Sequence, residues 1–208
     1  MVRILEKTER RLGEKLFIKG DRCLGPKCGA VRRNYPPGMH GKKRTRRREA
    51  SGFGVLLNEK QKIRFLYGLD DRDIARYSKE ASSRRGIFSV LLLQMLEKRL
   101  DNVVFRLGFS DSRRMARQLV SHGHVRINGK RVRSPSLCVQ KGDIISLNEA
   151  FLKSPAFAPI ETRLKKYDPP HWLSIDKVRK QGGILEDPKD EDIGVTIDVA
   201  KIKEFYSR

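Results

Sequence analysis

The chain has 208 residues, with 46 lysines and arginines against 25 aspartates and glutamates, and therefore a formal net charge of +21 at pH 7. Such an excess of positive charge repels itself unless a polyanion neutralises it, which makes nucleic acid the first partner to consider. No apolar run approaches the ~20 residues of a membrane-spanning helix, and three cysteines, an odd number, exclude a disulfide framework.

An irregular basic arm is expected after the first segment, Met1 to Lys7, which lacks the apolar stretch of a signal peptide. From Arg22 to Arg48 the chain has ten lysines and arginines, no acidic residue, and repeated proline and glycine, which interrupt helices and strands. The end of this arm suits phosphate contacts and includes Arg44, Arg46, Arg47 and Arg48. A charge run of this kind can be merely solvated, but the charge of the whole chain favours an arm that becomes ordered on nucleic acid.

The segment from about Glu59 to Asn102 shows helical periodicity. Apolar residues recur at helical spacing around Ile63, and the pattern resumes after Asp70 and Asp71, which are candidate N-terminal capping residues. Helices with such stripes are most simply packed against each other. We therefore expect a helical core here and no cofactor site.

A further helix is predicted from Ser110 or Asp111, either of which could cap it, to about Gly123. At ~100° per residue, its apolar residues fall on one arc and its polar residues on the opposite one. The polar arc holds Arg113, Arg114, Arg117, Gln118 and Ser121. Like charges at i and i+4 destabilise a helix, so this arrangement indicates an anion that faces the arc.

A β-hairpin is predicted around Asn128-Gly129, because alternating apolar and polar residues flank the pair and a type I′ turn needs positive φ at both positions. Lys130 and Arg131 follow the turn, so helix and hairpin together predict a compact phosphate-binding surface. His122 and His124 lie between them, where each either contacts RNA or is only a turn residue. Further short strands are expected over 137–147, with Cys138 in the core.

The C-terminal part is mixed in character. Prolines interrupt it after Glu149, Trp172 and Leu173 are expected to anchor it to a core, and a final helix is expected over 198–206. An acidic cluster over 186–192 either contacts a basic protein neighbour or the chain's own arm, or forms a solvated loop, and we favour the loop.

Taken in order, these segments resemble the bacterial-type small-subunit ribosomal protein S-four family. The motifs that carry the resemblance include Asn34-Tyr35-Pro36-Pro37-Gly38, Arg99-Leu100-Asp101-Asn102-Val103, Ala116-Arg117-Gln118-Leu119-Val120 and Glu204-Phe205-Tyr206-Ser207-Arg208. The match covers nearly the whole chain. The helix and hairpin alone would be less specific, because several RNA-modifying enzymes and a tRNA synthetase carry a similar module.

The resemblance implies an α+β molecule with three parts. These are a basic arm with a helical domain over 1–97, a small RNA-binding domain over 98–160 in which a helix pair packs on a short-stranded antiparallel sheet, and a segment over 161–208 that packs back on the helical lobe. It also implies a cytoplasmic, structural constituent of the small ribosomal subunit with no catalytic site and no cofactor.

The family also suggests the partners. The resemblance implies direct binding to a multi-helix junction of small-subunit ribosomal RNA, which nucleates assembly of the subunit body and supports translational accuracy. It further implies contact with ribosomal protein S-five and other small-subunit proteins, and an arm near the mRNA where it enters the ribosome. We expect no membrane partner.

The cysteines depart from the family pattern. Many relatives carry four cysteines near the N-terminus that bind zinc or a cluster, whereas only Cys23 and Cys28 are present here and Glu6 and Glu9 take the places of the first pair. A structural zinc site needs four good ligands. We therefore expect no bound metal, and we expect both carboxylates to face basic residues.

An RNA-modifying enzyme is the main alternative, because the helix and hairpin commonly accompany pseudouridine synthases. The four histidines include His40 and His171, and none forms a recognisable catalytic set with serine, cysteine or aspartate. The sequence also lacks a glycine-rich phosphate loop. A free RNA chaperone or translational repressor is a third class, which co-sedimentation with small subunits would separate from a ribosomal protein.

Overall fold

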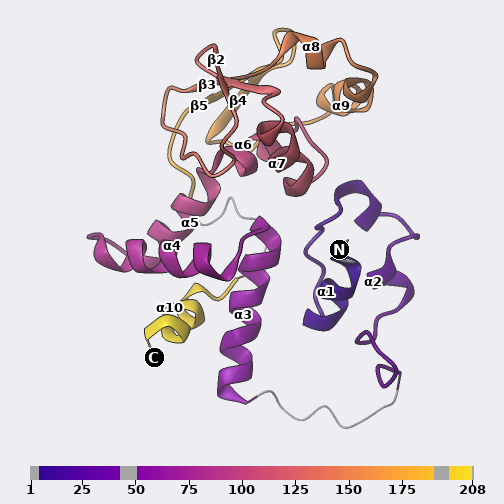
Figure 1. Cartoon of the computed structure of the whole chain (residues 1–208), viewed down its shortest axis with the longest axis vertical. Helices are drawn as coiled ribbons and strands as arrows, with labels where there is room; N and C mark the ends of the chain where they lie inside the picture. The colour runs from indigo at the N-terminus through magenta and orange to yellow at the C-terminus, as the bar shows by residue number, and fades with distance from the viewer. Residues whose placement is uncertain (1–4, 43–50, 190–196, 208) are drawn as a thin grey trace. The chain divides into compact units, whose positions relative to one another are not determined.

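The computed structural model describes residues 5–42, 51–189 and 197–207, so the four arginines predicted at the end of the arm, 44 and 46–48, lie outside the described residues. The chain forms two compact units, one made of residues 1–89 and 195–208 and the other of residues 90–194 (Figure 1). Both helices and one antiparallel sheet are present, which confirms the predicted α+β class. None of the described helices combines the length and the apolar composition that a membrane crossing requires.

The first unit is helical. Its elements are α1 (Leu5–Leu12), η1 (Gly20–Cys23), α2 (Gly29–Arg32), α3 (Gly52–Tyr67), α4 (Asp71–Ser83) and α10 (Val199–Ser207), and α5 (Phe88–Glu97) begins at the division between the units. Ser51 caps α3 by accepting a hydrogen bond from the Gly54 amide, and Gly68 ends it at φ 64°. Asp70 takes the N-cap position of α4, but its side chain makes no capping hydrogen bond.

The C-terminal helix packs on the helical core of this unit. α10 lies against α3 and α4, with Ile202 fully buried (Figure 1). The buried carboxylate of Glu59 accepts hydrogen bonds from Lys62 Nζ at 2.7 Å and from the backbone amide of Asp198 at 3.2 Å. This pairing satisfies two buried polar groups and fixes the start of α10 on α3.

The second unit combines helices with a five-stranded antiparallel sheet. Its helical elements are α6 (Leu100–Arg106), α7 (Arg113–Ser121), α8 (Glu149–Leu152), η2 (Pro155–Phe157) and α9 (Ala158–Leu164). Its strands are β1 (Val125–Ile127), β2 (Lys130–Val132), β3 (Ile144–Leu147), β4 (Leu173–Asp176) and β5 (Gln181–Ile184), in the order β2-β1-β3-β5-β4. A single hydrophobic core joins these helices to the sheet and contains Trp172 and Leu173, as predicted.

The hairpin is as predicted. Asn128 and Gly129 have φ of 50° and 80°, and Ile127 pairs with Lys130 across the turn. Positive φ at both turn positions matches the right-handed twist of the flanking strands. The turn therefore fixes the register that carries the basic residues of β2.

The segment after residue 160 differs from the expectation. We expected 161–208 to pack back on the helical lobe, whereas β5 pairs with β3 and extends the sheet of the second unit, and only 195–208 belongs to the first. The backbone pairing with β3 holds this segment on the second unit, and Gly182 allows the close approach to α6, because a Cβ there would meet the Leu107 side chain at 2.5 Å. From the predicted acidic cluster, Asp187 pairs with Lys98 instead of lying in a wholly solvated loop.

Cys138 corrects a second expectation. It is exposed and forms only an isolated bridge with Arg99 in place of a core strand. Its neighbour Val139 takes the buried position. A one-residue shift exchanges the faces of an extended segment, which explains the difference.

Candidate nucleic-acid interface

Helix α7 presents a polar face to solvent. Ser112, and neither Ser110 nor Asp111, caps it, since Ser112 Oγ accepts a hydrogen bond from the Met115 amide at 3.3 Å. The apolar arc is packed in the core, with Ala116 and Val120 fully buried. The polar arc leaves three predicted binding residues exposed, namely Arg114, Arg117 and Gln118.

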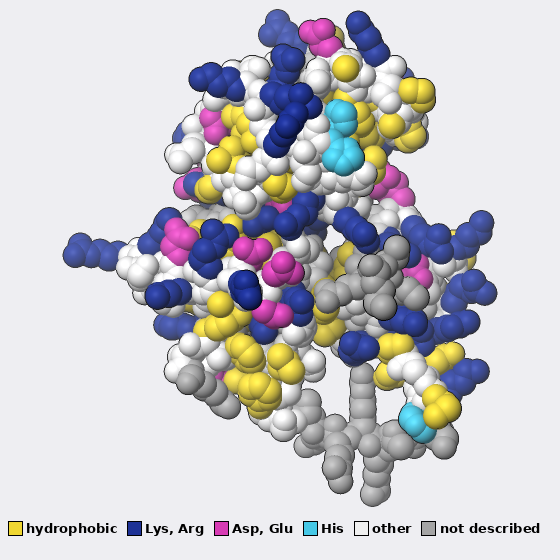
Figure 2. All heavy atoms as spheres, in the orientation of Figure 1, with side chains coloured by type: hydrophobic (Ala, Val, Ile, Leu, Met, Phe, Trp, Pro, Cys, Tyr) yellow, Lys and Arg dark blue, Asp and Glu magenta, His cyan; other side chains and the backbone are white. Residues whose placement is uncertain are grey.

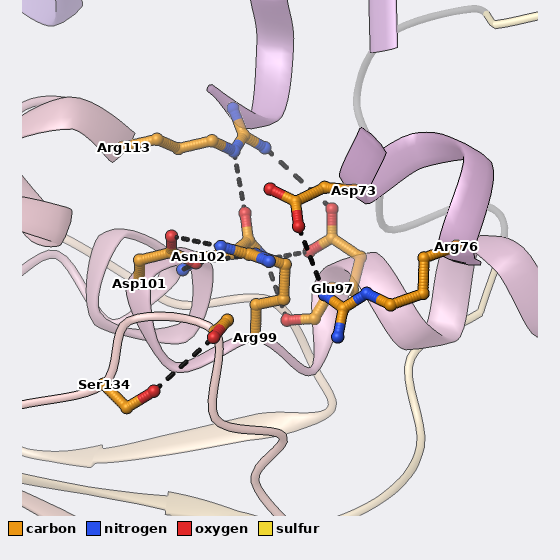
Figure 3. A network of polar contacts seen from close by, with 9 residues as sticks. Asp73, Arg76, Glu97, Arg99, Asp101, Asn102, Arg113 and Ser134 are labelled. Atoms are coloured by element: carbon orange, nitrogen blue, oxygen red, sulfur yellow. Dashed lines mark hydrogen bonds and ion pairs between the residues drawn. The ribbon is translucent and has the colours of Figure 1, made fainter. Parts of the chain in front are cut away.

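Arg113 does not share that exposed arc. Its Nε donates to Asn102 Oδ1 at 2.7 Å, a terminal nitrogen lies 3.9 Å from Glu97, and its guanidinium lies 4.7 Å from the ring centroid of Phe105 (Figure 3). Only 13% of the side chain is exposed. The prediction that Arg113 faces RNA with its neighbours is therefore wrong about its orientation, because a buried carboxylate and a buried amide at the start of α6 hold it inside.

The side chains that accept these hydrogen bonds belong to a buried polar network. The Glu97 side chain, 1% exposed, accepts a hydrogen bond from Asn102 Nδ2 at 2.7 Å (Figure 3). It also accepts hydrogen bonds from Arg106 at 2.9 and 3.0 Å. Beside it, Arg99 donates to Asp101 at 2.8 and 3.1 Å, with both side chains nearly fully buried. Buried charges are tolerated only when paired in this way, so the network fixes α7 against α6.

The hairpin is joined to the end of α7 by Arg131. Its Nε donates to the Gly123 carbonyl at 2.8 Å and a terminal nitrogen donates to the His122 carbonyl at 2.9 Å. A cation at this place also complements the negative end of a helix dipole. Gly123 has φ 72°, and a Cβ there would overlap the Arg131 guanidinium, so the glycine is required by the bridge as well as by the turn. Arg131 therefore fixes the hairpin relative to α7.

The two histidines lie at this junction. Their rings are 5.9 Å apart, and the half-buried His124 ring also lies 4.9 Å from Phe151. Burial, together with the charges of His122 and Arg131, lowers the pKa of His124, so this side chain is neutral at pH 7. The His124 ring thus packs beside Phe151, while His122 is exposed next to it.

The exposed charge on this face is positive. Figure 2 shows Lys and Arg side chains beside the histidines on the second unit. The exposed cations of the helix and hairpin are Arg114, Arg117, Lys130, Arg131 and Arg133. Of the nearby acids, Asp111 is paired with Arg163, while Asp143 accepts hydrogen bonds from Asn128 and from the Gln140 amide. The face thus suits an extended polyanion.

The carboxylates near the N-terminus have different roles. Glu6 faces basic residues, as predicted, because it accepts hydrogen bonds from Lys19 at 3.1 Å and Arg22 at 3.2 Å. Glu9 does not face basic residues. It is 2% exposed, and its Oε1 accepts hydrogen bonds from the backbone amides of Leu16 at 3.2 Å and Ile18 at 3.1 Å. A buried carboxylate can be satisfied by amides alone, which sequence spacing does not reveal.

Residues Glu9, Cys23 and Cys28 bring one potential metal ligand each within 4.8 Å of one another. A closed structural zinc site takes four ligands. Glu6, the remaining candidate, is engaged by Lys19 and Arg22. Burial, with the Glu9 charge nearby, raises the pKa of the Cys23 thiol and so favours its neutral form. The residues present do not fit a structural zinc ion.

Sequence reasoning missed the residues that support this face. Glu97 and Asn102 were assigned to a helical stretch, and only their helical periodicity was considered. A polar pair inside an apolar stretch was the available signal, because buried polar groups need partners.

Two family models match the chain, "Ribosomal protein S4/S9 N-terminal domain" over residues 5–97 and "S4 domain" over residues 98–145. Curated relatives named "Small ribosomal subunit protein uS4" match nearly its full length. The protein of Syntrophomonas wolfei is 45% identical over 199 residues, and that of Thermus thermophilus is 46% identical over 204 residues. Each alignment covers 96% of this chain and 94% of the relative.

Proposed function

The chain belongs to the uS4 family of small ribosomal subunit proteins, and from this premise we propose that α7 and the hairpin hold ribosomal RNA at a junction of several helices. Membership makes the protein a structural, RNA-binding constituent of the small subunit in the cytoplasm and excludes the enzymatic alternative, since the relatives are ribosomal structural proteins. The junction as target, and the residues that contact it, are the proposal.

One observation carries this proposal: exposed cations from two elements sit on a frame that the protein itself makes rigid. Arg114 and Arg117 project from a helix whose other face is core, and Lys130 lies in a hairpin that Arg131 ties to that helix. Phosphate contacts position a protein on nucleic acid and supply most of its affinity. Cations held at fixed separations favour one spatial arrangement of phosphates over others.

The mechanism is recognition of shape. Side chains cannot read the deep, narrow major groove of A-form RNA. A junction, by contrast, brings backbones of several helices together at angles that a single duplex lacks. Arg114, Arg117, Gln118, His122 and Lys130 are proposed to contact that backbone, whereas Arg113 and His124 hold the surface in place.

Early binding to such a junction would nucleate assembly of the subunit body. We propose this role, and a contribution to translational accuracy through contacts with ribosomal protein S-five and with mRNA, on the resemblance stated above. The position of this surface on a self-contained folded unit supports direct binding before other proteins arrive. Order-of-addition reconstitution would test the assembly role.

The binding proposal is tested by measuring the affinity of the full chain for a fragment of small-subunit ribosomal RNA that comprises the first domain of that RNA. The measurement is made over a salt series with duplex RNA as competitor. We expect Arg114→Glu with Arg117→Glu to weaken competitor-resistant binding by roughly a hundredfold, because two phosphate contacts become repulsive. The matched control is Lys153→Glu with Lys166→Glu, which makes the same charge change at exposed positions near α8 and α9.

Unchanged affinity in the first variant would contradict the proposal, and so would an equal loss in the control. Binding that duplex competitor removes entirely would favour the free RNA chaperone instead.

A further inference from the structure

A cavity of about 500 Å³ lies between α1 and α3 of the first unit. The residues of its wall that matter for binding are Lys7, Arg11, Asn58, Gln61, Arg64 and Phe65, and a threonine and two leucines complete it. This volume falls in the range of small-ligand sites. It lies in a different unit from α7 and the hairpin.

The charged side chains that line this cavity are all positive. Its wall holds three cations and no carboxylate. Lys7 and Arg11 are both exposed and lie at i and i+4 on α1, a spacing at which like charges repel unless an anion lies between them. Asp71 pairs with Arg64 at 3.0 Å and does not line the cavity.

Arg64 supplies the third positive charge of the wall. Its terminal nitrogen donates to Gln61 at 3.3 Å, and its guanidinium lies 5.4 Å from the centroid of the Phe65 ring. Its Nε is buried and has no hydrogen-bond partner among the described residues. That atom has almost no accessible surface and so does not face the cavity, and Arg64 contributes to the site the positive charge of its guanidinium, which also pairs with Asp71.

The remaining wall suits a planar ring. Phe65 and the two leucines are apolar and half-buried, and the Asn58 and Gln61 amides offer both donors and acceptors. Aromatic side chains bind single-stranded nucleic acid by stacking on its bases, and cations beside them bind its phosphates. Cations, amides and an aromatic ring in one cavity are therefore the complement of a nucleotide.

We propose that the cavity between α1 and α3 binds one unpaired nucleotide of the ribosomal RNA. Lys7, Arg11 and Arg64 hold its phosphate, and its base lies against Phe65. This inference rests on the proposed function, because the ligand is part of the RNA that the second unit binds. RNA offers such nucleotides in loops and bulges, where bases are free to leave the stack.

The test combines binding with chemical footprinting of the first-domain RNA fragment, using the full chain. We expect Lys7→Gln with Arg11→Gln to weaken binding about tenfold and to lower the salt slope by about 1.5, as for two lost phosphate contacts. The variant should lose protection at a few unpaired nucleotides and keep the protection given by the second unit. Phe65→Leu, which keeps an apolar side chain, should weaken binding at least about fivefold.

The control is Arg72→Gln with Lys79→Gln, which removes the same charge from exposed positions on α4. An equal loss in this control, or unchanged binding and footprint in the Lys7 and Arg11 variant, would overturn the proposal. Both Lys7 and Arg11 are exposed, so their variant reports on binding even if Phe65→Leu unfolds. Calorimetry with free nucleoside monophosphates provides the last arm, since micromolar binding would assign the cavity to a free nucleotide and also overturn it.

The two proposals can fail separately. If Arg114→Glu with Arg117→Glu binds like the unchanged protein, the proposed function fails. If only the Lys7 and Arg11 variant does so, the nucleotide site alone fails.

Discussion

Two regions of the molecule use carboxylates to hold arginine and lysine, and they differ in burial. At the end of α5, Glu97 is 1% exposed and holds Arg106 of α6 and Arg113 of α7 inside the second unit. Near the N-terminus, Glu6 is 14% exposed and holds Lys19 and Arg22, of which Arg22 is largely in solvent. Ion pairs in water contribute little stability, whereas removing one partner of a buried pair is costly. The same pairing is thus structural in one region and secondary in the other.

The largest effect on stability is expected from a substitution of Glu97. Glu97→Gln keeps the size of the side chain but removes the buried carboxylate that Arg106 and Arg113 contact, which should lower the free energy of unfolding by about 3–5 kcal/mol. Urea unfolding measures this free energy and is followed by the fluorescence of Trp172, the only tryptophan of the sequence, which lies in the core of the second unit. Glu161→Gln, which removes an exposed partner of Lys180, is the control and should leave the transition nearly unchanged. A similar midpoint in both variants would show that the buried network is not the determinant.

A smaller effect should separate two adjacent arginines. Arg113→Gln should lower the free energy of unfolding by about 1–3 kcal/mol, because it removes a charged donor from a partly buried network. Arg114→Gln should leave unfolding unchanged and lower the salt slope of RNA binding by about 0.7–0.9, as for one phosphate contact. Each variant is measured in both assays. If Arg113→Gln affected only binding and Arg114→Gln only stability, the assignment of the two side chains would be reversed.

The smallest effect is expected at Glu6 and is confined to neutral and weakly acidic solution. Burial alone would raise the pKa of Glu6, but the hydrogen bonds and charges of Lys19 and Arg22 outweigh it and lower that pKa. A lowered pKa means that the ionised carboxylate stabilises the fold above its usual pKa of about 4.3, and that this contribution disappears as the pH falls through the folded value. Glu6→Gln should therefore speed amide hydrogen exchange over residues 6–28 slightly at pH 7, and this difference should shrink as the pH falls below about 4.3.

A chelator provides the matching control for that region. Because the donor set does not fit a structural zinc ion, EDTA should leave the exchange pattern at pH 7 unchanged. Faster exchange over the same residues on chelation would show that Glu9, Cys23 and Cys28 hold a metal after all.

The sequence predicted the features that depend on neighbours in the chain. Asn128-Gly129 requires positive φ at two consecutive positions, and the apolar arc of α7 must be buried, so both followed from local rules. The burial of Arg113 did not follow from local rules, because it depends on Glu97. That residue lies 16 positions earlier, in a segment where only helical periodicity was evident.

Two other misses have the same origin. The place of β5 beside β3 depends on the close approach of Gly182 to Leu107, and the role of Glu9 depends on amides that a turn brings to it. Composition counts cations and acids, but only the packed chain decides which of them face each other. The polar arc of α7 is therefore exposed at Arg114, Arg117 and Gln118, as predicted, whereas the predicted exposure of Arg113 is wrong.

The bridge from Arg131 to the end of α7 also bears on how long a complex would last. Arginine loses rotamer entropy when a partner immobilises it, and flexible loops lose more. Here the carbonyls of His122 and Gly123 already hold both the side chain and the hairpin that carries it. Because this ordering is already present before RNA binds, protein and RNA lose less conformational entropy when they associate. The favourable free energy of their contacts is therefore reduced less. Differences in affinity between related complexes reside mainly in dissociation rates, and a pre-ordered surface of this kind is expected to release its RNA slowly.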